Sequence, residues 1–182
     1  MATPEEIVTH IERLGLVVRS AHLKRALTRL EKSPTLNFWR LIYGNLLDVA
    51  VLEWCKVFGS NTEPTHWKRI VADEEHFRIE LLKFLRIEET RWTEYWHHMK
   101  DYRDSRIAHH WDLETLDSYP DLTLALESSY FYYDYLIKEL RRQGETNFPD
   151  DLREYCERYT AQALEIGRAA LAATASFSER VD

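Results

Sequence analysis

Apolar residues recur along this chain at alternating steps of three and four residues, the spacing of one helix face. The first stripe runs through Ile7, Ile11, Leu14, Val18 and Ala21. Thr3 precedes this stripe and can cap the helix, because its hydroxyl can accept a hydrogen bond from a free amide of the first turn. The last stripe begins near Asp150 and comprises Leu152, Cys156, Tyr159, Ala163, Ile166, Ala170, Ala173 and Phe177. The pattern thus predicts a long helix at each end.

The segments between these two helices also show helical spacing. The expected elements are a helix over 35–58, a short turn over 66–71, a helix opened by Asp73 or a neighbour, a segment over 90–109, a loop over 111–121 and a helix closed by Gly144. Whether the chain breaks at 87–90 is left open by the pattern. The helix over 35–58 is apolar nearly all round, so we expect it at the centre of the core or shared with a partner subunit.

Length and composition agree with one all-α domain. The chain has 182 residues with five Gly and five Pro, too few turn-forming residues for an all-β fold. No segment alternates convincingly as a strand does. We therefore predict a single all-α bundle over 1–182, with about five or six helices and no sheet.

Cysteine use and charge narrow the classes of function. Cys55 and Cys156 lie in apolar helical stretches without a CxxC motif, which favours reduced core thiols. No signal peptide or membrane-spanning run is visible, so we expect a cytoplasmic protein without membrane contact. The net charge of −7 argues against a long nucleic-acid interface, so any such contact must be local.

One short segment concentrates side chains suited to phosphodiester chemistry. It reads Tyr102-Arg103-Asp104-Ser105-Arg106-Ile107-Ala108-His109-His110. A guanidinium is permanently charged, and its planar fork suits phosphate oxygens. An imidazole can take and give a proton near neutral pH. Together these groups can cleave a phosphodiester without a metal.

The Arg103-Asp104 pair with His109 six residues after the arginine resembles the signature of the HEPN superfamily. Further likeness to its abortive-infection HEPN-like family is carried by 50–60, 66–68, 102–104 and 107–110, so that it covers roughly 35–115. The resemblance implies an HEPN-like core at about 35–145 with the terminal helices packed on it, and a homodimer whose two motifs face each other. Active members cut RNA without a metal or other cofactor.

The resemblance also implies roles for single residues. His109 would be the general acid/base, Arg103 would hold the phosphate, and Asp104 would orient one of them. His110 is a further catalytic candidate. Substrate contacts are assigned to Arg106, Lys100 and Tyr102. Trp111 stands where related toxins often carry a tyrosine two residues after the histidine, so regulation through such a tyrosine is not supported.

Helix geometry leaves the choice of histidine open. Residues six apart on a continuous α-helix point about 120° away from each other, so Arg103 and His109 do not share a face. His110 shares a face with Arg103 and with Arg106. For Arg103 and His109 to meet at one phosphate, the helix must end or distort near Ala108, or the two residues must come from different subunits.

Simpler interpretations exist for several of these residues. Charged residues such as Arg103 and Arg106 often form no more than a solvated helix face. The aromatic run 130–135 invites base stacking, but its spacing places Tyr130 and Tyr133 in the core and Tyr132 and Tyr135 outward, so we interpret it mostly as packing.

A metal site is not predicted. Glu94-x-x-His97 and Asp73-x-x-His76 approach the spacing of di-iron bundles, but the further inward-facing glutamates are lacking. Glu53, inside the strongly apolar helix, is expected to pair with a buried arginine or lysine, or with a helix end.

The sequence therefore favours a metal-independent endoribonuclease in phage defence or of toxin type, for which a protein antitoxin is a candidate partner. The alternative is a non-catalytic helical dimer that binds a nucleotide or a protein partner.

Overall fold

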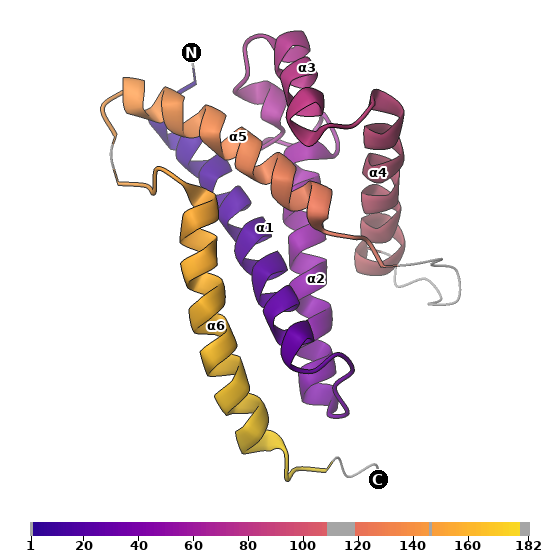
Figure 1. The fold of residues 1–182 in the computed structure, drawn as a ribbon. Coiled ribbons are helices and arrows are strands. Elements are labelled where there is room, and N and C mark those ends of the chain that lie inside the picture. Colours follow the sequence, from indigo (N-terminus) through magenta and orange to yellow (C-terminus); the bar gives the residue numbers. More distant parts are fainter. Residues whose placement is uncertain (1, 109–118, 146, 179–182) are drawn as a thin grey trace.

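The computed structural model describes residues 2–108, 119–145 and 147–178, and their regular elements are all helices (Figure 1). The elements are α1 (Pro4–Leu30), α2 (Asn37–Phe58), a 3₁₀ helix (Trp67–Arg69), α3 (Glu74–Leu85), α4 (Glu89–Tyr102), a π-helix (Arg103–Ala108), α5 (Thr123–Arg142) and α6 (Leu152–Thr174). This confirms the predicted all-α bundle. None of the described helices has the length and apolar character that a membrane span requires.

Helix α1 begins where the sequence predicts. Thr3 and Glu6 form a capping box: Glu6 N donates to the Thr3 hydroxyl over 3.3 Å, and Thr3 N donates to the Glu6 carboxylate over 2.8 Å. Figure 1 shows α1 running between α6 and α2, with α5 crossing it. The stripe from Ile7 to Ala21 is buried in the main core, so α1 is a central element of the bundle.

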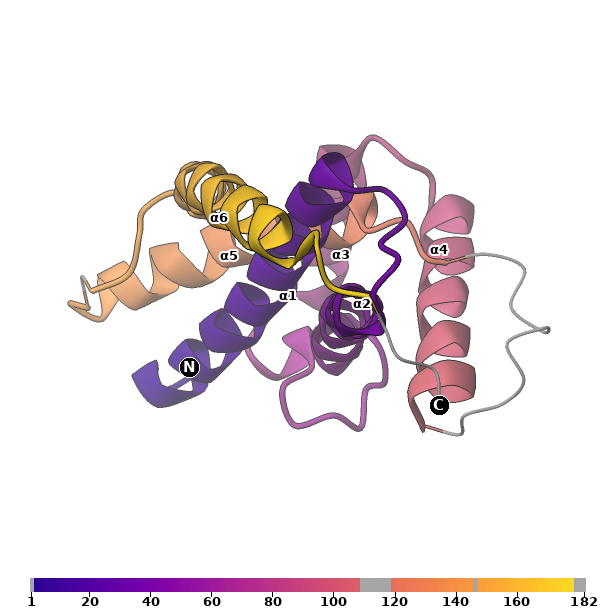
Figure 2. The ribbon, with the colours of Figure 1, turned by 90° about the horizontal axis from the view of Figure 1, so that it is seen from below.

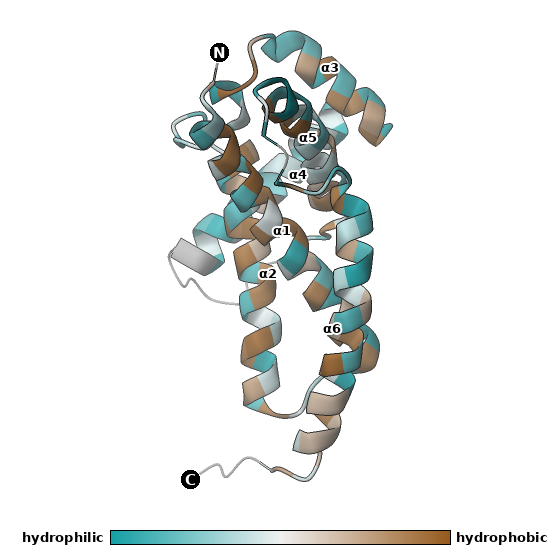
Figure 3. Ribbon diagram, turned by 90° about the vertical axis from the view of Figure 1, so that its left-hand side faces the viewer, coloured by the Kyte–Doolittle hydropathy of each residue, from teal (hydrophilic) through white to brown (hydrophobic). Residues whose placement is uncertain are grey.

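Helix α2 lies against α1 and α4 and supplies much of the core. Figure 2, which looks nearly along α2, shows α1 on one side of it and α4 on the other. Trp54 of α2 is fully buried, and its Nε1 donates to the Ser128 hydroxyl over 3.0 Å. Apolar residues occur along the whole of α2 (Figure 3), as expected for a helix covered on more than one side.

Glu53 of α2 has the pairing that the sequence predicts for a carboxylate in an apolar helix. It is 5% exposed, and its two oxygens lie 3.0 Å from Arg13 Nη1 and 2.6 Å from Lys56 Nζ. The two cations offset the loss of hydration that burial of this carboxylate entails. Cys55 and Cys156 are both buried and free, as predicted.

The break between α3 and α4, which the pattern left open, occurs at Arg86. Arg86 adopts a left-handed conformation with φ of 55°, and its amide donates to the carbonyls that end α3. Asp73 caps α3 by accepting from His76 N over 2.9 Å, as the sequence predicts. Helix α4 then starts at Glu89 and returns along α2.

The expectation that Tyr132 faces outward is wrong. Tyr130 and Tyr133 are buried as predicted, but Tyr132 is 0% exposed, and its hydroxyl lies 2.9 Å from His10 Nδ1. The physical reason is that α5 packs against α1 and also against α3, so that more than one stripe of the helix is covered. Tyr135 is partly buried and contacts Phe77 of α3 edge-on.

Candidate functional site

Helix α4 changes its winding at the start of the Arg/His motif. The α-helix ends at Tyr102 and continues as a π-helix over Arg103–Ala108. A π-turn closes its hydrogen bonds over five residues instead of four, and such turns often occur at functional sites. Faces deduced from α-helical spacing therefore do not apply beyond Tyr102.

Arg103 is held along one edge by its neighbour. Its Nε and Nη2 both lie 2.7 Å from Asp104 Oδ1, and its side chain is 18% exposed. This guanidinium carries five N–H donors, and no other residue in the described ranges accepts a hydrogen bond from it. Arg103 therefore keeps donors that a bound oxyanion could use.

Arg106 turns from the same π-helix toward α2. Its Nε lies 3.6 Å from Asp48 Oδ1, too far for a hydrogen bond, and is buried without a hydrogen-bond partner among the described residues. The guanidinium lies 5.8 Å from the centroid of the Tyr119 ring. Gly44 of α2 lies close by, since a Cβ there would be in ordinary van der Waals contact with Arg106 Nη2 at 4.0 Å.

Asp48 connects α2 to the end of α4. Its Oδ1 accepts a hydrogen bond from the Tyr102 hydroxyl over 2.7 Å and also faces Arg106. Tyr102 is fully buried, and this burial, together with the bond to Asp48, raises the pKa of Tyr102. The hydroxyl therefore stays protonated. In this structure Tyr102 positions Asp48, in contrast to the predicted contact with substrate.

Lys100 lies one turn before the π-helix. Its Nζ is 4.3 Å from the centroid of the Trp96 ring, a cation–π contact along one face of α4. Cys55 packs close by and donates to Met99 O over 3.7 Å. Burial raises the pKa of the Cys55 thiol to about 12, even though Arg103 and Lys100 oppose this rise. Cys55 is therefore unsuited to be a nucleophile.

Lys100, Arg103, Asp104 and Arg106 all lie around the end of α4, where Arg103 contacts Asp104, Lys100 faces Trp96 and Arg106 faces Asp48. His109 and His110 lie outside the described residues. Sequence reasoning missed Asp48, although a signal existed: Asp48 is a second carboxylate in the apolar helix that carries Glu53. Tyr119 was missed as well, because nothing in its local sequence indicates that it meets Arg106.

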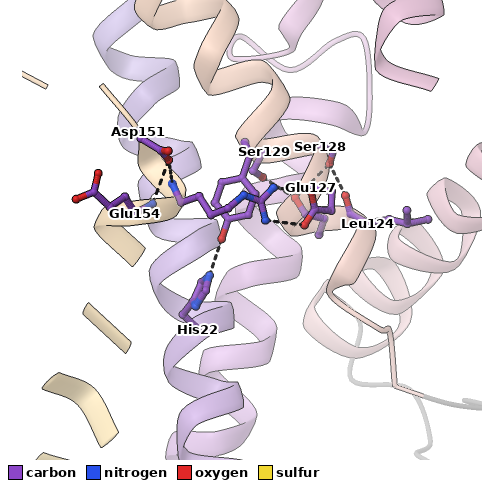
Figure 4. Close-up of polar contacts among 10 residues, drawn as sticks. His22, Leu124, Glu127, Ser128, Ser129, Asp151 and Glu154 are labelled. Carbon is purple, nitrogen blue, oxygen red and sulfur yellow. Dashed lines mark hydrogen bonds and ion pairs between the residues drawn. The ribbon is translucent and has the colours of Figure 1, made fainter. Parts of the chain in front are cut away.

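A second polar cluster lies between α1, α5 and α6 (Figure 4). His22 Nδ1 is 2.8 Å from the Thr160 hydroxyl, and His22 Nε2 is 2.6 Å from the Tyr130 hydroxyl. Because Thr160 already donates to a carbonyl of its own helix, it must accept from Nδ1–H, so Nε2 accepts from Tyr130. Burial, helped by nearby arginines, lowers the pKa of His22 and keeps it neutral.

Arg153 of α6 also belongs to this cluster and contacts Glu127 and Tyr130. Its two terminal nitrogens lie 3.0 and 2.7 Å from the two oxygens of Glu127, and its guanidinium lies 4.2 Å from the centroid of the Tyr130 ring. The fork of Arg153 is thus matched by a carboxylate, and both ring nitrogens of His22 have partners. The cluster joins three helices and leaves no reactive group free.

The described part of the chain contains no cluster of side chains that could bind a metal ion. Among those residues, no three His, Cys, Asp or Glu side chains gather closely enough to hold a metal ion. The Glu94/His97 and Asp73/His76 spacings are thus not assembled into one cluster.

The chain matches no protein-family model, no curated protein and no solved structure. The resemblance to HEPN proteins therefore stays a prediction.

Proposed function

We propose that the protein is a metal-independent endoribonuclease of the HEPN type, acting in phage defence or as a toxin. The observation that carries this proposal is the change from α- to π-helical winding at the Arg/His motif. Two guanidiniums lie in this π-helix, and each faces a carboxylate along one edge: Asp104 for Arg103 and Asp48 for Arg106. Guanidiniums fixed in this way are preorganised for a phosphate.

In the proposed reaction, His109 takes the proton from a ribose 2′-hydroxyl, and the 2′-oxygen attacks the neighbouring phosphorus. Arg103 donates to the phosphate oxygens on which charge grows. The 5′-oxygen leaves with a proton from a second imidazole, either His110 or His109 of the second subunit. The products then end in a 2′,3′-cyclic phosphate and a 5′-hydroxyl. Asp104 orients Arg103.

A homodimer is part of this proposal. Helix α2 leaves an apolar stripe uncovered, with Phe38 61%, Leu41 64% and Val49 37% exposed. Asp48 lies beside Val49 on the same helix, so a second copy packed on this stripe would approach the Arg106 side of the motif. Burial of these side chains would favour association, and a neutralising protein partner could cover the same face.

A second candidate is a non-catalytic helical dimer that binds a nucleotide or a protein. It is favoured by the ion pairs of Arg103 and Arg106, which already neutralise part of their charge, and by the net charge of −7. In this case the fold and the dimer would be retained without cleavage.

Cleavage of structured RNA in the presence of a chelator tests the proposal. Wild type should cut it to 2′,3′-cyclic products. Arg103→Lys keeps the charge but loses the planar fork, and should slow cleavage by about 100-fold or more. His109→Ala/His110→Ala should slow it by a similar or larger factor. Matched controls are Arg158→Lys and His76→Ala on exposed faces of α6 and α3, which should cut like wild type.

Equal cleavage by wild type and the motif variants, or none by either, would refute the nuclease. Retained binding of RNA without cleavage would then favour the second candidate. Light scattering tests the dimer separately, and a strict monomer would refute a composite site.

A further inference from the structure

A basic cleft of about 410 Å³ lies between α1, α2 and the segment that leads into α5. Three cations of α1 line it: Lys24, Arg25 and Arg29. Among the described residues of the lining, the carboxylate that faces them is that of Asp121. In a chain with a net charge of −7, this is a local excess of positive charge in a concave site.

Lys24 is partly buried in this cleft and has no acidic partner among the described residues. Its Nζ lies 4.7 Å from the centroid of the Tyr43 ring, and no described carboxylate lies within ion-pair distance of it. Loss of hydration lowers the pKa of Lys24. The cation–π contact with Tyr43 offsets part of this loss. An anion in the cleft would supply the missing counter-charge.

The two arginines differ in how far they are neutralised. Arg25 Nη2 donates to the Thr123 hydroxyl over 2.8 Å and lies 3.6 Å from Asp121 Oδ1. That carboxylate is 75% exposed and also accepts from Thr123. Arg29 is exposed and makes no ion pair within the described ranges. Lys24 and Arg29 are therefore the two cations that a ligand can engage.

The cleft adjoins the Arg/His motif across α2. Leu47 lines the cleft and Tyr43 lies beneath Lys24, whereas the next residues, Gly44 and Asp48, face Arg106. In the segment before α5, Pro120 lines the cleft, and the ring centroid of the neighbouring Tyr119 lies 5.8 Å from the Arg106 guanidinium. The cations of α1 and Arg106 thus lie on adjacent faces of α2, a helix about 10 Å in diameter.

We propose that this cleft binds backbone phosphates of the RNA strand, flanking the phosphate at the motif. The inference rests on the proposed function and names where the strand continues: over 119–122 and onto α1. Lys24 and Arg29 each pair with a phosphate oxygen, and Arg25 stays fixed by Thr123. The rest of the chain carries net negative charge and repels the RNA strand, so the strand is held to the cleft on leaving the motif.

The test is the salt dependence of binding to single-stranded 2′-O-methyl RNA, whose blocked hydroxyl prevents cleavage. Neutralising two phosphate contacts in Lys24→Gln/Arg29→Gln should make the slope of log K against log salt less steep by about 1.4. Binding should weaken by a similar factor for RNAs of different sequence. Lys24→Arg/Arg29→Lys keeps both charges and should keep the slope. The matched control Lys138→Gln/Arg168→Gln removes exposed cations of α5 and α6 and should also keep it.

An unchanged slope in Lys24→Gln/Arg29→Gln, with an unchanged circular dichroism spectrum, would overturn the inference and leave the nuclease standing. A reduced slope in a protein that never cleaves RNA would support the cleft and refute the nuclease. Failure of wild type to bind the RNA would overturn the cleft as an RNA site. If inorganic pyrophosphate then still raised the Tm of wild type but not of the neutralised variant, the cleft would belong to a small phosphate ligand.

Discussion

The hydrogen bond between Tyr102 and Asp48 joins the end of α4 to the middle of α2, and its removal should destabilise the fold. The donor is fully buried, whereas the Asp48 side chain is 27% exposed. Asp48→Ala therefore leaves a buried hydroxyl without an acceptor. Tyr102→Phe leaves a carboxylate that water can still reach, so we expect it to be the milder change.

The magnitudes follow from this difference in exposure. A buried donor without a partner costs roughly 1–3 kcal/mol, so Asp48→Ala should lower the free energy of unfolding by about 2 kcal/mol. In a domain of this size that corresponds to roughly 4–8 °C in Tm. Tyr102→Phe should cost about 1 kcal/mol. The double variant loses the same bond only once, so the coupling energy should be about 1–2 kcal/mol.

A double-mutant cycle measured by urea unfolding tests this expectation. The loss of the Asp48 charge beside Arg106 occurs in both Asp48→Ala and the double variant, so it cancels in the coupling energy. Tyr159→Phe combined with Asp48→Ala is the matched control, because Tyr159 lies on α6 and has no contact with Asp48. Its effects should add within about 0.5 kcal/mol. A coupling energy for Tyr102 and Asp48 no larger than that of the control would refute the bond's role.

Three further expectations concern pH, packing and thiol reactivity. Burial lowers the pKa of His10 from 6.5 to about 4, so protons bind the unfolded chain preferentially. The free energy of unfolding should therefore fall as the pH drops from about 6.5 to about 4, by up to about 1.4 kcal/mol per pH unit. Urea unfolding of His10→Asn should show a weaker pH dependence, and a dependence equal to that of wild type would contradict the assignment. Gly15→Ala should raise the Tm, because only the flexible end of Arg19 lies 3.0 Å from the new Cβ. Gly167→Ala should give no such gain, since the side chains of Leu27 and Leu30 lie 3.0 and 3.1 Å from the new Cβ. Similar Tm values for the two variants would count against this packing. Burial raises the thiol pKa to about 12 for Cys55 and to about 11 for Cys156, so a disulfide reagent at pH 8 should label both only after denaturant is added.

Helix positions were predictable because their determinants are local. The Thr3 cap, the Asp73 cap and the three-and-four spacing of apolar residues act within one or two turns, so the sequence carries them directly. The pairing of Glu53 was predictable for a similar reason, because a carboxylate in an apolar helix requires a cation wherever the helix packs. The identity of that cation, Arg13 of another helix, was not predictable.

Helix faces were predictable only where one side of a helix is covered. Spacing assigned Tyr132 to the outside, but α5 is covered by α1 and by α3, and the pattern of a single helix does not report how many neighbours it has. The same limit applies to the motif. Spacing treats 90–109 as one α-helix, whereas the chain winds as a π-helix from Arg103.

The sequence by itself determined the class of fold, the capped starts of α1 and α3 and the chemical content of the motif, since these depend on local propensity and residue type. Only the tertiary structure decided that Asp48 and Tyr119 meet Arg106, that Tyr102 is buried, and that Lys24 and Arg29 share a cleft beside the motif. These contacts join α1, α2, α4 and the start of α5, and such long-range pairings depend on how the helices pack, which no single segment encodes.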